Sequence, residues 1–310
     1  AIGHIALNAN TSGASNTALG SQSLLVNTTG ANNIAAGFAA LTANTTGDNN
    51  VAVGSLALDA NTTADGNTAV GQGAMSGTTT GAENVAIGLS SLYTNTTGAS
   101  NTAIGKGALF ANTTASLNTA VGFGAMYANT TGGRNVAVGA NAYNASDTEN
   151  DNIAIGYDAM TTDTAGGQYN IGIGNYALDA LTSGDYNVSL GYDSLTFNAA
   201  GSSNTAIGHG AMKDNLAGTN TAVGYLSLFE NTTGADNVAI GSGAMYGNSG
   251  NSTGSANVAV GVSALNVNQG GASNVAVGYG ALAANTTASS NVAVGRDALL
   301  TNTTGNNNIA

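Results

Sequence analysis

The chain has 310 residues, a formal net charge of −12 and only 6% charged residues, well below the roughly 25% of an ordinary soluble domain. It contains no cysteine, which excludes disulfide scaffolds, cysteine-ligated metals and thiol chemistry. Four basic residues are too few for a nucleic-acid footprint, and no apolar run approaches the ~20 residues that span a bilayer, so we expect neither nucleic-acid binding nor membrane insertion of this segment. The hydrophobic share of 42% indicates an ordered chain, and the composition favours an extracellular location.

A repeat begins within the first few residues and continues to the last. Each unit opens with Asn, followed by Thr, Val or Ile, then a small residue, an aliphatic residue and Gly. Most units are 17 residues long, and the longer or shorter ones vary in their second half, where we expect turns to absorb the difference. The leading asparagines are Asn16, Asn33, Asn50, Asn67, Asn84, Asn101, Asn118, Asn135, Asn152, Asn170, Asn187, Asn204, Asn220, Asn237, Asn257, Asn274, Asn291 and Asn308.

The length of the unit predicts the fold. A helical pair or a propeller blade needs about 33 to 50 residues, whereas one coil of a β-solenoid needs fewer. The alternation that follows each leading Asn, as in residues 85–87, is typical of a strand. A second strand is expected through pairs such as Ala108-Leu109 and Ala244-Met245. We therefore predict an all-β protein, a parallel β-roll of about eighteen coils forming one continuous array over residues 1–310, with both ends inside a repeat.

Two residues recur at the same position of the repeat, the motif Gly and the leading Asn, and this recurrence indicates structural roles. A Gly four residues after each leading Asn suggests a backbone position with positive φ, or a close approach of neighbouring coils. Stacked coils would also align the leading asparagines into a ladder of side-chain amides. The residues assigned to these structural rows are Asn16, Asn33, Asn50, Asn84, Asn101, Asn118, Asn135, Gly20, Gly54, Gly88 and Gly105.

The strand alternation leaves two arrangements open. If the alanine row fills a narrow interior, the aliphatic row points outward and another surface must cover it. If the aliphatic row is inside, no large apolar row is left exposed to solvent. We favour the first arrangement, which predicts self-association. The candidate interface residues are Val53, Ile87, Ile104, Val121, Ile155, Ile240 and Val294.

Few residues suggest chemistry. His4 and His209 occupy the same repeat position as residues of many other types, which indicates an exposed turn. No nucleophile has a base at a recognisable spacing, so we predict a protein that is not an enzyme and has no cofactor. The one candidate metal site is a Ca²⁺ site at Asp147, Glu149 and Asp151, for which a solvated charged loop is the favoured alternative.

Aromatic residues recur at two further repeat positions. They can stack on one another along the coils, or they can stack on sugars. The residues in these positions include Phe123, Tyr157 and Tyr225 in the first and Tyr93, Phe110, Tyr127, Phe229 and Tyr246 in the second.

The motif Asn-Val-Ala-Ile-Gly, present at residues 84–88 and 237–241, resembles the head repeats of trimeric autotransporter (YadA-like) adhesins. It is also similar to repeats of phage tail fibres and other bacterial surface fibres. The resemblance covers essentially the whole chain. It implies a left-handed parallel β-roll, usually three chains side by side with the aliphatic rows facing a shared axis.

These observations favour a non-enzymatic structural or adhesive segment of an extracellular fibre, as an adhesin head or a surface-filament subunit. Its expected partners are copies of itself, in a trimer or an end-to-end filament, and a host or surface ligand such as a carbohydrate. The alternative is an ice-binding solenoid with Thr and Asn rows. Against this alternative, the Asn-Thr-Thr row is interrupted where Ser146, Asp163 and Leu181 replace the Asn.

Overall fold

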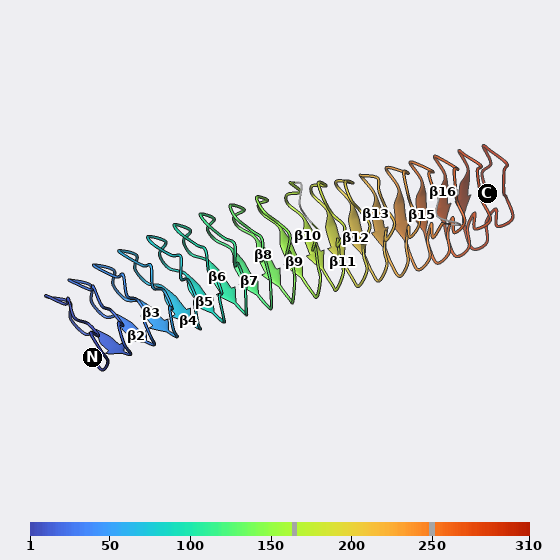
Figure 1. The fold of residues 1–310 in the computed structure, drawn as a ribbon. Helices are drawn as coiled ribbons and strands as arrows, with labels where there is room; N and C mark the ends of the chain where they lie inside the picture. Colours follow the sequence, from blue (N-terminus) through green and yellow to red (C-terminus); the bar gives the residue numbers. More distant parts are fainter. Residues whose placement is uncertain (163–165, 248–251) are drawn as a thin grey trace. The chain divides into compact units, whose positions relative to one another are not determined.

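The computed structural model describes residues 1–162, 166–247 and 252–310. In these residues all regular secondary structure is β, and each strand has three residues. The chain divides into two compact units, Ala1–Asn152 and Ile153–Ala310. In each unit the backbone winds through successive coils that stack on one another (Figure 1). The prediction of an all-β solenoid is confirmed.

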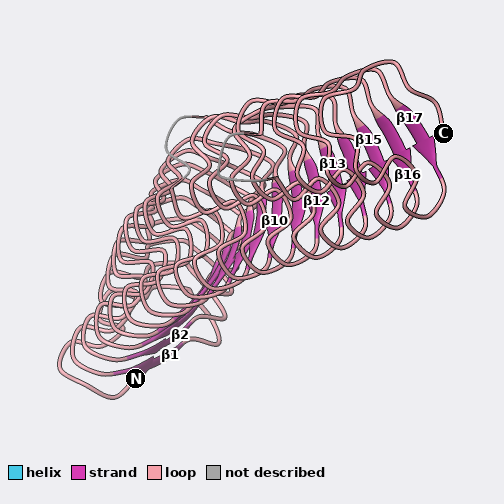
Figure 2. Cartoon of the chain, turned by 90° about the vertical axis from the view of Figure 1, so that its right-hand side faces the viewer, coloured by secondary structure: helices cyan, strands magenta, loops and turns pink. Residues whose placement is uncertain are grey.

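Each coil contributes one strand, and the strands of a unit pair in parallel (Figure 2). The first unit contains β1 (Thr17–Leu19), β2 (Ile34–Ala36), β3 (Val51–Val53), β4 (Thr68–Val70), β5 (Val85–Ile87), β6 (Thr102–Ile104), β7 (Thr119–Val121) and β8 (Val136–Val138). The second unit contains β9 (Ile153–Ile155), β10 (Ile171–Ile173), β11 (Val188–Leu190), β12 (Thr205–Ile207), β13 (Thr221–Val223), β14 (Val238–Ile240), β15 (Val258–Val260), β16 (Val275–Val277) and β17 (Val292–Val294).

Coils of unusual length keep the strands in register. Ala239 of β14 pairs with Ala259 of β15 although this coil is longer than the others, just as Ala86 pairs with Ala103 in a regular coil. Irregular lengths are therefore absorbed outside the strands, as expected. Since a one-residue slip would turn every side chain to the opposite face, this register preserves the inside and outside rows of each unit.

The interior of each coil is lined by small residues on the strand side and by a row of Leu and Met on the opposite side. The middle residue of every strand is buried, and its two neighbours are partly or fully exposed. Ala86 and Leu92 are fully buried, whereas Ile87 remains 40% exposed. The structure therefore has the first of the two arrangements, with the alanine row inside and the aliphatic row outside.

The predicted second strand is wrong. At Ser90 and Leu92 the backbone has positive φ, at 52° and 50°, which is not a strand conformation. The segment still bonds to the coils on both sides, because the Ser90 N–H donates to the Gln72 carbonyl and the Leu92 N–H to the Ala108 carbonyl. Each left-handed residue costs about 1–2 kcal/mol, and burying the Leu92 side chain gains about 1.5–3 kcal/mol, so burial offsets much of the cost of the two left-handed residues and the hydrogen bonds to both neighbouring coils add to it.

The motif glycine is required for two reasons. Gly88 has a φ of +134°, and a Cβ at this position would lie 2.6 Å from the carbonyl oxygen of Gly105 in the next coil. Both the positive φ and the close approach predicted from the sequence are present. A side chain here would separate the coils that the strands hold together.

Candidate interaction surfaces

The outward strand face is a uniform surface that recurs on every strand of each unit. It consists of the first and third residues of the strands, which are Thr, Val, Ile, Leu or Ala and are never charged in the described strands. Of the candidate interface residues, Val53, Ile87, Ile104, Ile240 and Val294 are exposed. The other two, Val121 and Ile155, are partly exposed. Contiguous apolar surface of this kind is typical of interaction sites.

The leading asparagines join neighbouring coils mainly through the backbone. The Asn50 side-chain oxygen accepts a hydrogen bond from the Asn67 backbone N–H at 2.9 Å, and its amide nitrogen donates to the Ala64 carbonyl at 2.8 Å. Some members also donate to the preceding side chain, as Asn101 does to Asn84 at 3.1 Å. The row is therefore largely a side-chain-to-backbone ladder, because the amide oxygen faces the next N–H and satisfies it.

The first residues of the Asn-Thr-Thr triplets form a more direct amide ladder. Asn44 donates to the Asn27 side-chain oxygen at 2.7 Å, and Asn61 donates to that of Asn44 at 2.8 Å. These side chains are fully buried. They also donate within their own turn, as Asn44 does to the Gly47 carbonyl at 3.0 Å. The sequons at Asn27, Asn44 and Asn61 are consequently inaccessible to a glycosyltransferase once the chain has folded.

The acidic residues Asp147, Glu149 and Asp151 are directed to separate partners. The buried Glu149 carboxylate accepts hydrogen bonds from the backbone N–H groups of Asp147 and Thr148, at 2.8 and 3.0 Å. Asp151 forms a bidentate ion pair with Arg134, at 2.6 and 2.7 Å. Within the ranges that the structure describes, no cluster of three or more His, Asp or Glu side chains could hold a metal ion.

The histidines lie in exposed turns, as their repeat position indicated. His209 stacks between Tyr192 and Tyr225, with ring centroids 5.3 and 5.4 Å away. The same row includes Tyr157, whose pKa is raised because its hydroxyl is hydrogen-bonded to the Asp158 carboxylate. In the second unit this row has the character of side-chain packing along the coils.

A second aromatic row forms a continuous stack in the first unit. Tyr93, Phe110 and Tyr127 stack with ring centroids 5.2 and 4.9 Å apart and planes within 3° of parallel. Stacking covers the inner ring faces, so the free faces are those at the two ends of the stack. Both ends adjoin hollows in the surface.

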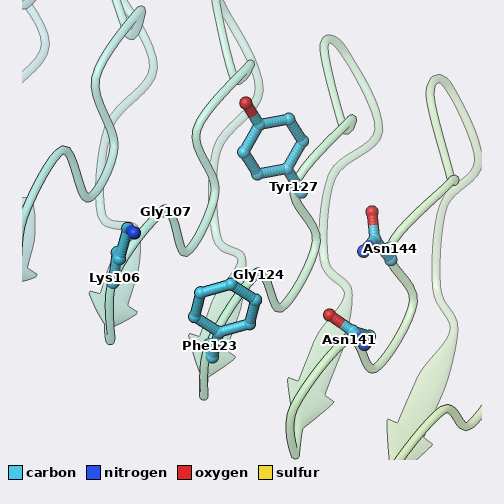
Figure 3. Close-up of a pocket in the computed structure, with 7 residues that line it drawn as sticks. All are labelled: Lys106, Gly107, Phe123, Gly124, Tyr127, Asn141 and Asn144. Atoms are coloured by element: carbon cyan, nitrogen blue, oxygen red, sulfur yellow. The ribbon is translucent and has the colours of Figure 1, made fainter.

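The hollow beside Tyr127 has a volume of about 260 Å³. Figure 3 shows its residues on three successive coils: Lys106 and Gly107, then Phe123, Gly124 and Tyr127, then Asn141 and Asn144. The two glycines form the floor because they place no side chain between the row of Phe123 and the row of Tyr127. The Asn141 and Asn144 amides close one end; a Cβ on Gly124 would lie 3.2 Å from the Asn141 side-chain oxygen.

The hollow at the opposite end of the stack has a volume of about 360 Å³. It repeats the same construction two coils earlier, with Gly73 as floor and with Gln72, Ser76 and Tyr93 around it. At Gly73 a Cβ would meet the Tyr93 ring at 3.3 Å, so the glycine leaves room for the ring. The two hollows lie at opposite ends of the same aromatic stack, and we call the hollows together with the stack the aromatic groove (Leu56, Gln72, Gly73, Ser76, Leu89, Ser90, Tyr93, Lys106, Gly107, Phe110, Phe123, Gly124, Tyr127, Asn141 and Asn144).

Charge distinguishes the aromatic groove from the rest of the surface. Three of the four basic residues pair with carboxylates: Arg134 with Asp151, Lys213 with Asp193, and Arg296 with Asp297. Lys106 forms no ion pair with any carboxylate in the described part of the chain. Its ammonium group lies 5.8 Å from the centroid of the Phe123 ring, at the edge of the hollow.

Sequence reasoning identified the aromatic positions but missed the groove. The signal was available in the repeat itself, because aligning the coils places Lys106 beside Phe123 and Gly107 beside Gly124 in adjacent columns. Two small residues side by side, flanked by aromatic residues, predict a hollow.

The chain has no match among models of known protein families, and none among curated proteins. None of the described residues belongs to a helix long and apolar enough to cross a membrane.

Proposed function

We propose that the chain is a non-enzymatic structural segment of an extracellular fibre, in which copies assemble side by side through their outward strand faces. The observation that carries the proposal is the uninterrupted absence of charge on this face, in a chain whose net charge is −12. In the described part of the chain, the charged side chains lie outside the strands. A surface selected only for solubility would not exclude charge from one face on every strand.

The face suits association with a copy of itself. The strands of a unit present the same two rows at the same spacing, so a second copy offers a surface of equal length, shape and polarity. Burial of apolar area then supplies the free energy of association, at about 25 cal/mol for each Å² removed from water. A trimer with the faces around a shared axis is the arrangement that the repeat resemblance implies, and an adhesive role at a cell surface is part of the same proposal.

Ice binding is the second candidate, and the hydrogen bonds of the Asn-Thr-Thr turns weigh against it. The Thr28 hydroxyl donates to the Thr45 carbonyl at 2.9 Å, and the Thr45 hydroxyl donates to the Thr62 carbonyl at 3.0 Å. These hydroxyl protons are therefore committed to the neighbouring coil and are not free to order water. Ser146 and Leu181 interrupt the Asn row as noted, and Asp163 lies outside the described residues.

The test places a charge on the strand face. The double variant Ile87→Lys, Ile104→Lys introduces two lysines where both side chains already reach solvent, so the fold should persist and assembly should fail. The matched control is Leu117→Lys, which makes the same kind of change at an exposed leucine outside the strands. Native mass by light scattering should fall to that of one chain in the double variant alone. An unchanged mass in the double variant would overturn the proposal.

A further inference from the structure

We propose that the aromatic groove of the first unit binds an acidic polysaccharide, a chain of pyranose rings bearing carboxylates. The inference is independent of assembly, because the groove lies in the turns and the proposed interface lies on the strands. Three features of the groove carry it: ring faces for the sugar, amides for its hydroxyls and an ammonium group for its charge.

The ring faces are available where the stack ends. The inner faces of the Tyr93, Phe110 and Tyr127 rings cover one another, and Tyr127, the last ring of the stack, lines the hollow together with Asn141 and Asn144 (Figure 3). Phe123 lies across the hollow and is 58% exposed. The apolar C–H face of a pyranose fits against an aromatic ring in such a position, and burying the ring face contributes to binding.

Polar groups border the same space. The side chains of Asn141 and Asn144 line the hollow beside Tyr127, and those of Gln72 and Ser90 line the one beside Tyr93, where the Ser76 hydroxyl already donates to the Asp59 carboxylate at 2.6 Å. Amides and hydroxyls both donate and accept hydrogen bonds, which matches the mixed character of sugar hydroxyls. A few polar groups placed around apolar walls are the usual composition of a small-molecule site.

Lys106 specifies an acidic sugar. It is the one basic residue that the described part of the chain leaves without a carboxylate partner, and it lies beside Phe123 at the groove. An anionic ligand would otherwise be repelled by a chain of net charge −12. A carboxylate in the hollow would form a charge-assisted hydrogen bond with this ammonium group.

The extent of the groove indicates a polymer. The two hollows lie at opposite ends of the Tyr93–Phe110–Tyr127 stack, on successive coils of one unit. The spacing of about 5 Å between rings is comparable with the length of one pyranose unit in an extended chain. A ligand that occupied both hollows would therefore span several sugar units.

The test uses isothermal titration calorimetry on the full chain with hexamers of galacturonate, guluronate and hyaluronan. At least one should bind, and the fully methyl-esterified form of that hexamer should bind about tenfold more weakly, since it cannot form the charge-assisted bond to Lys106. Lys106→Gln should cause a similar loss, whereas Lys213→Gln, which removes a lysine already paired with Asp193, should leave the affinity unchanged.

A second variant, Gly124→Asn, fills the hollow and retains a backbone conformation that the coil already has. Gly124 has a φ of +61°, and Asn141, one coil later in the same row, has a φ of 54°, so the coil already accommodates asparagine there. Gly124→Asn should retain the thermal unfolding temperature and abolish binding. Failure of all three hexamers to bind at millimolar concentration would overturn the inference, as would a Gly124→Asn protein with unchanged affinity. Neither result would bear on assembly, which is tested separately by the native mass from light scattering.

Discussion

The buried side-chain oxygen of Asn61 has no hydrogen-bond partner, because the residue one coil later is Thr78 rather than asparagine. In the preceding coils the same position is filled by an amide that donates to its neighbour, as Asn61 itself does to Asn44 at 2.8 Å. The ladder thus has an interruption at Thr78. A buried acceptor without a donor is unfavourable by about 1–3 kcal/mol.

Thr78→Asn should therefore stabilise the chain. The new amide nitrogen would reach the Asn61 oxygen, and its oxygen would accept from Asn95, which now donates to the Thr78 hydroxyl at 3.4 Å. We expect a gain of about 1 kcal/mol in the free energy of unfolding, measured by urea denaturation. The control Thr78→Val removes the hydroxyl without supplying a donor and should give no gain. A lower stability for Thr78→Asn would contradict the ladder as an energetic element.

The close approach at the motif glycine predicts a large effect from a single methyl group. Gly88→Ala would place its Cβ 2.6 Å from the Gly105 carbonyl oxygen at a φ of +134°, so neighbouring coils must shift. We expect a loss of more than about 3 kcal/mol in the free energy of unfolding. The control is Gly66→Ala, where φ is +70° and the nearest atom is 3.8 Å away, and where about 1 kcal/mol is expected. Equal losses at both sites would argue against close approach as the cause.

The inside row should be far less tolerant of volume than the outside row. Ala86→Leu adds three carbon atoms to a fully buried position between coils, and we expect it to lower stability by about 3 kcal/mol. Ile87→Leu changes shape at a 40% exposed position and should alter stability by less than about 0.5 kcal/mol. Thermal unfolding followed by circular dichroism makes the comparison. A tolerant Ala86 would mean that the interior is wider than the alanine row suggests.

Acidification should weaken the contact between Asp151 and Arg134, and it should remove the unfavourable negative charge of the partly buried Asp214. The hydrogen bond from Arg134 holds the pKa of Asp151 below its usual value, so its contribution to stability is present above the unfolded pKa and is lost as pH falls through the folded one. Burial, with a smaller contribution from Glu230, raises the pKa of Asp214, against the lowering effect of Lys213. Its contribution is present below the unfolded pKa and is lost as pH rises through the folded one.

The two carboxylates can be separated by replacing each with its amide. Asp151→Asn should lower the unfolding temperature at pH 7, and the difference from the unmodified chain should vanish in strong acid. Asp214→Asn should raise the unfolding temperature at pH 7, with its advantage fading as the medium becomes acidic. A pH series of thermal melts gives both results. The same sign for both variants at pH 7 would contradict the assignment.

The repeat pattern predicted the solenoid fold but not the backbone conformation of every segment. Its length and alternation predicted the solenoid, and the invariably small residue, as at Ala86, indicated which row fits inside. The residue types did not predict the left-handed conformations at Ser90 and Leu92, because neither serine nor leucine prefers positive φ in isolation. The stacking of the coils imposes this conformation. The aromatic groove was missed for a related reason, since the hollow depends on glycines at 107 and 124 that become neighbours only when coils stack.

The most direct test of the account is the native mass of the unmodified chain, measured by light scattering across a range of concentrations. If the outward strand faces meet in solution, the mass should exceed 29.9 kDa, with about three chains expected for side-by-side assembly around an axis. A mass of one chain at every concentration would contradict the account, because the uncharged strand face would then remain open to water.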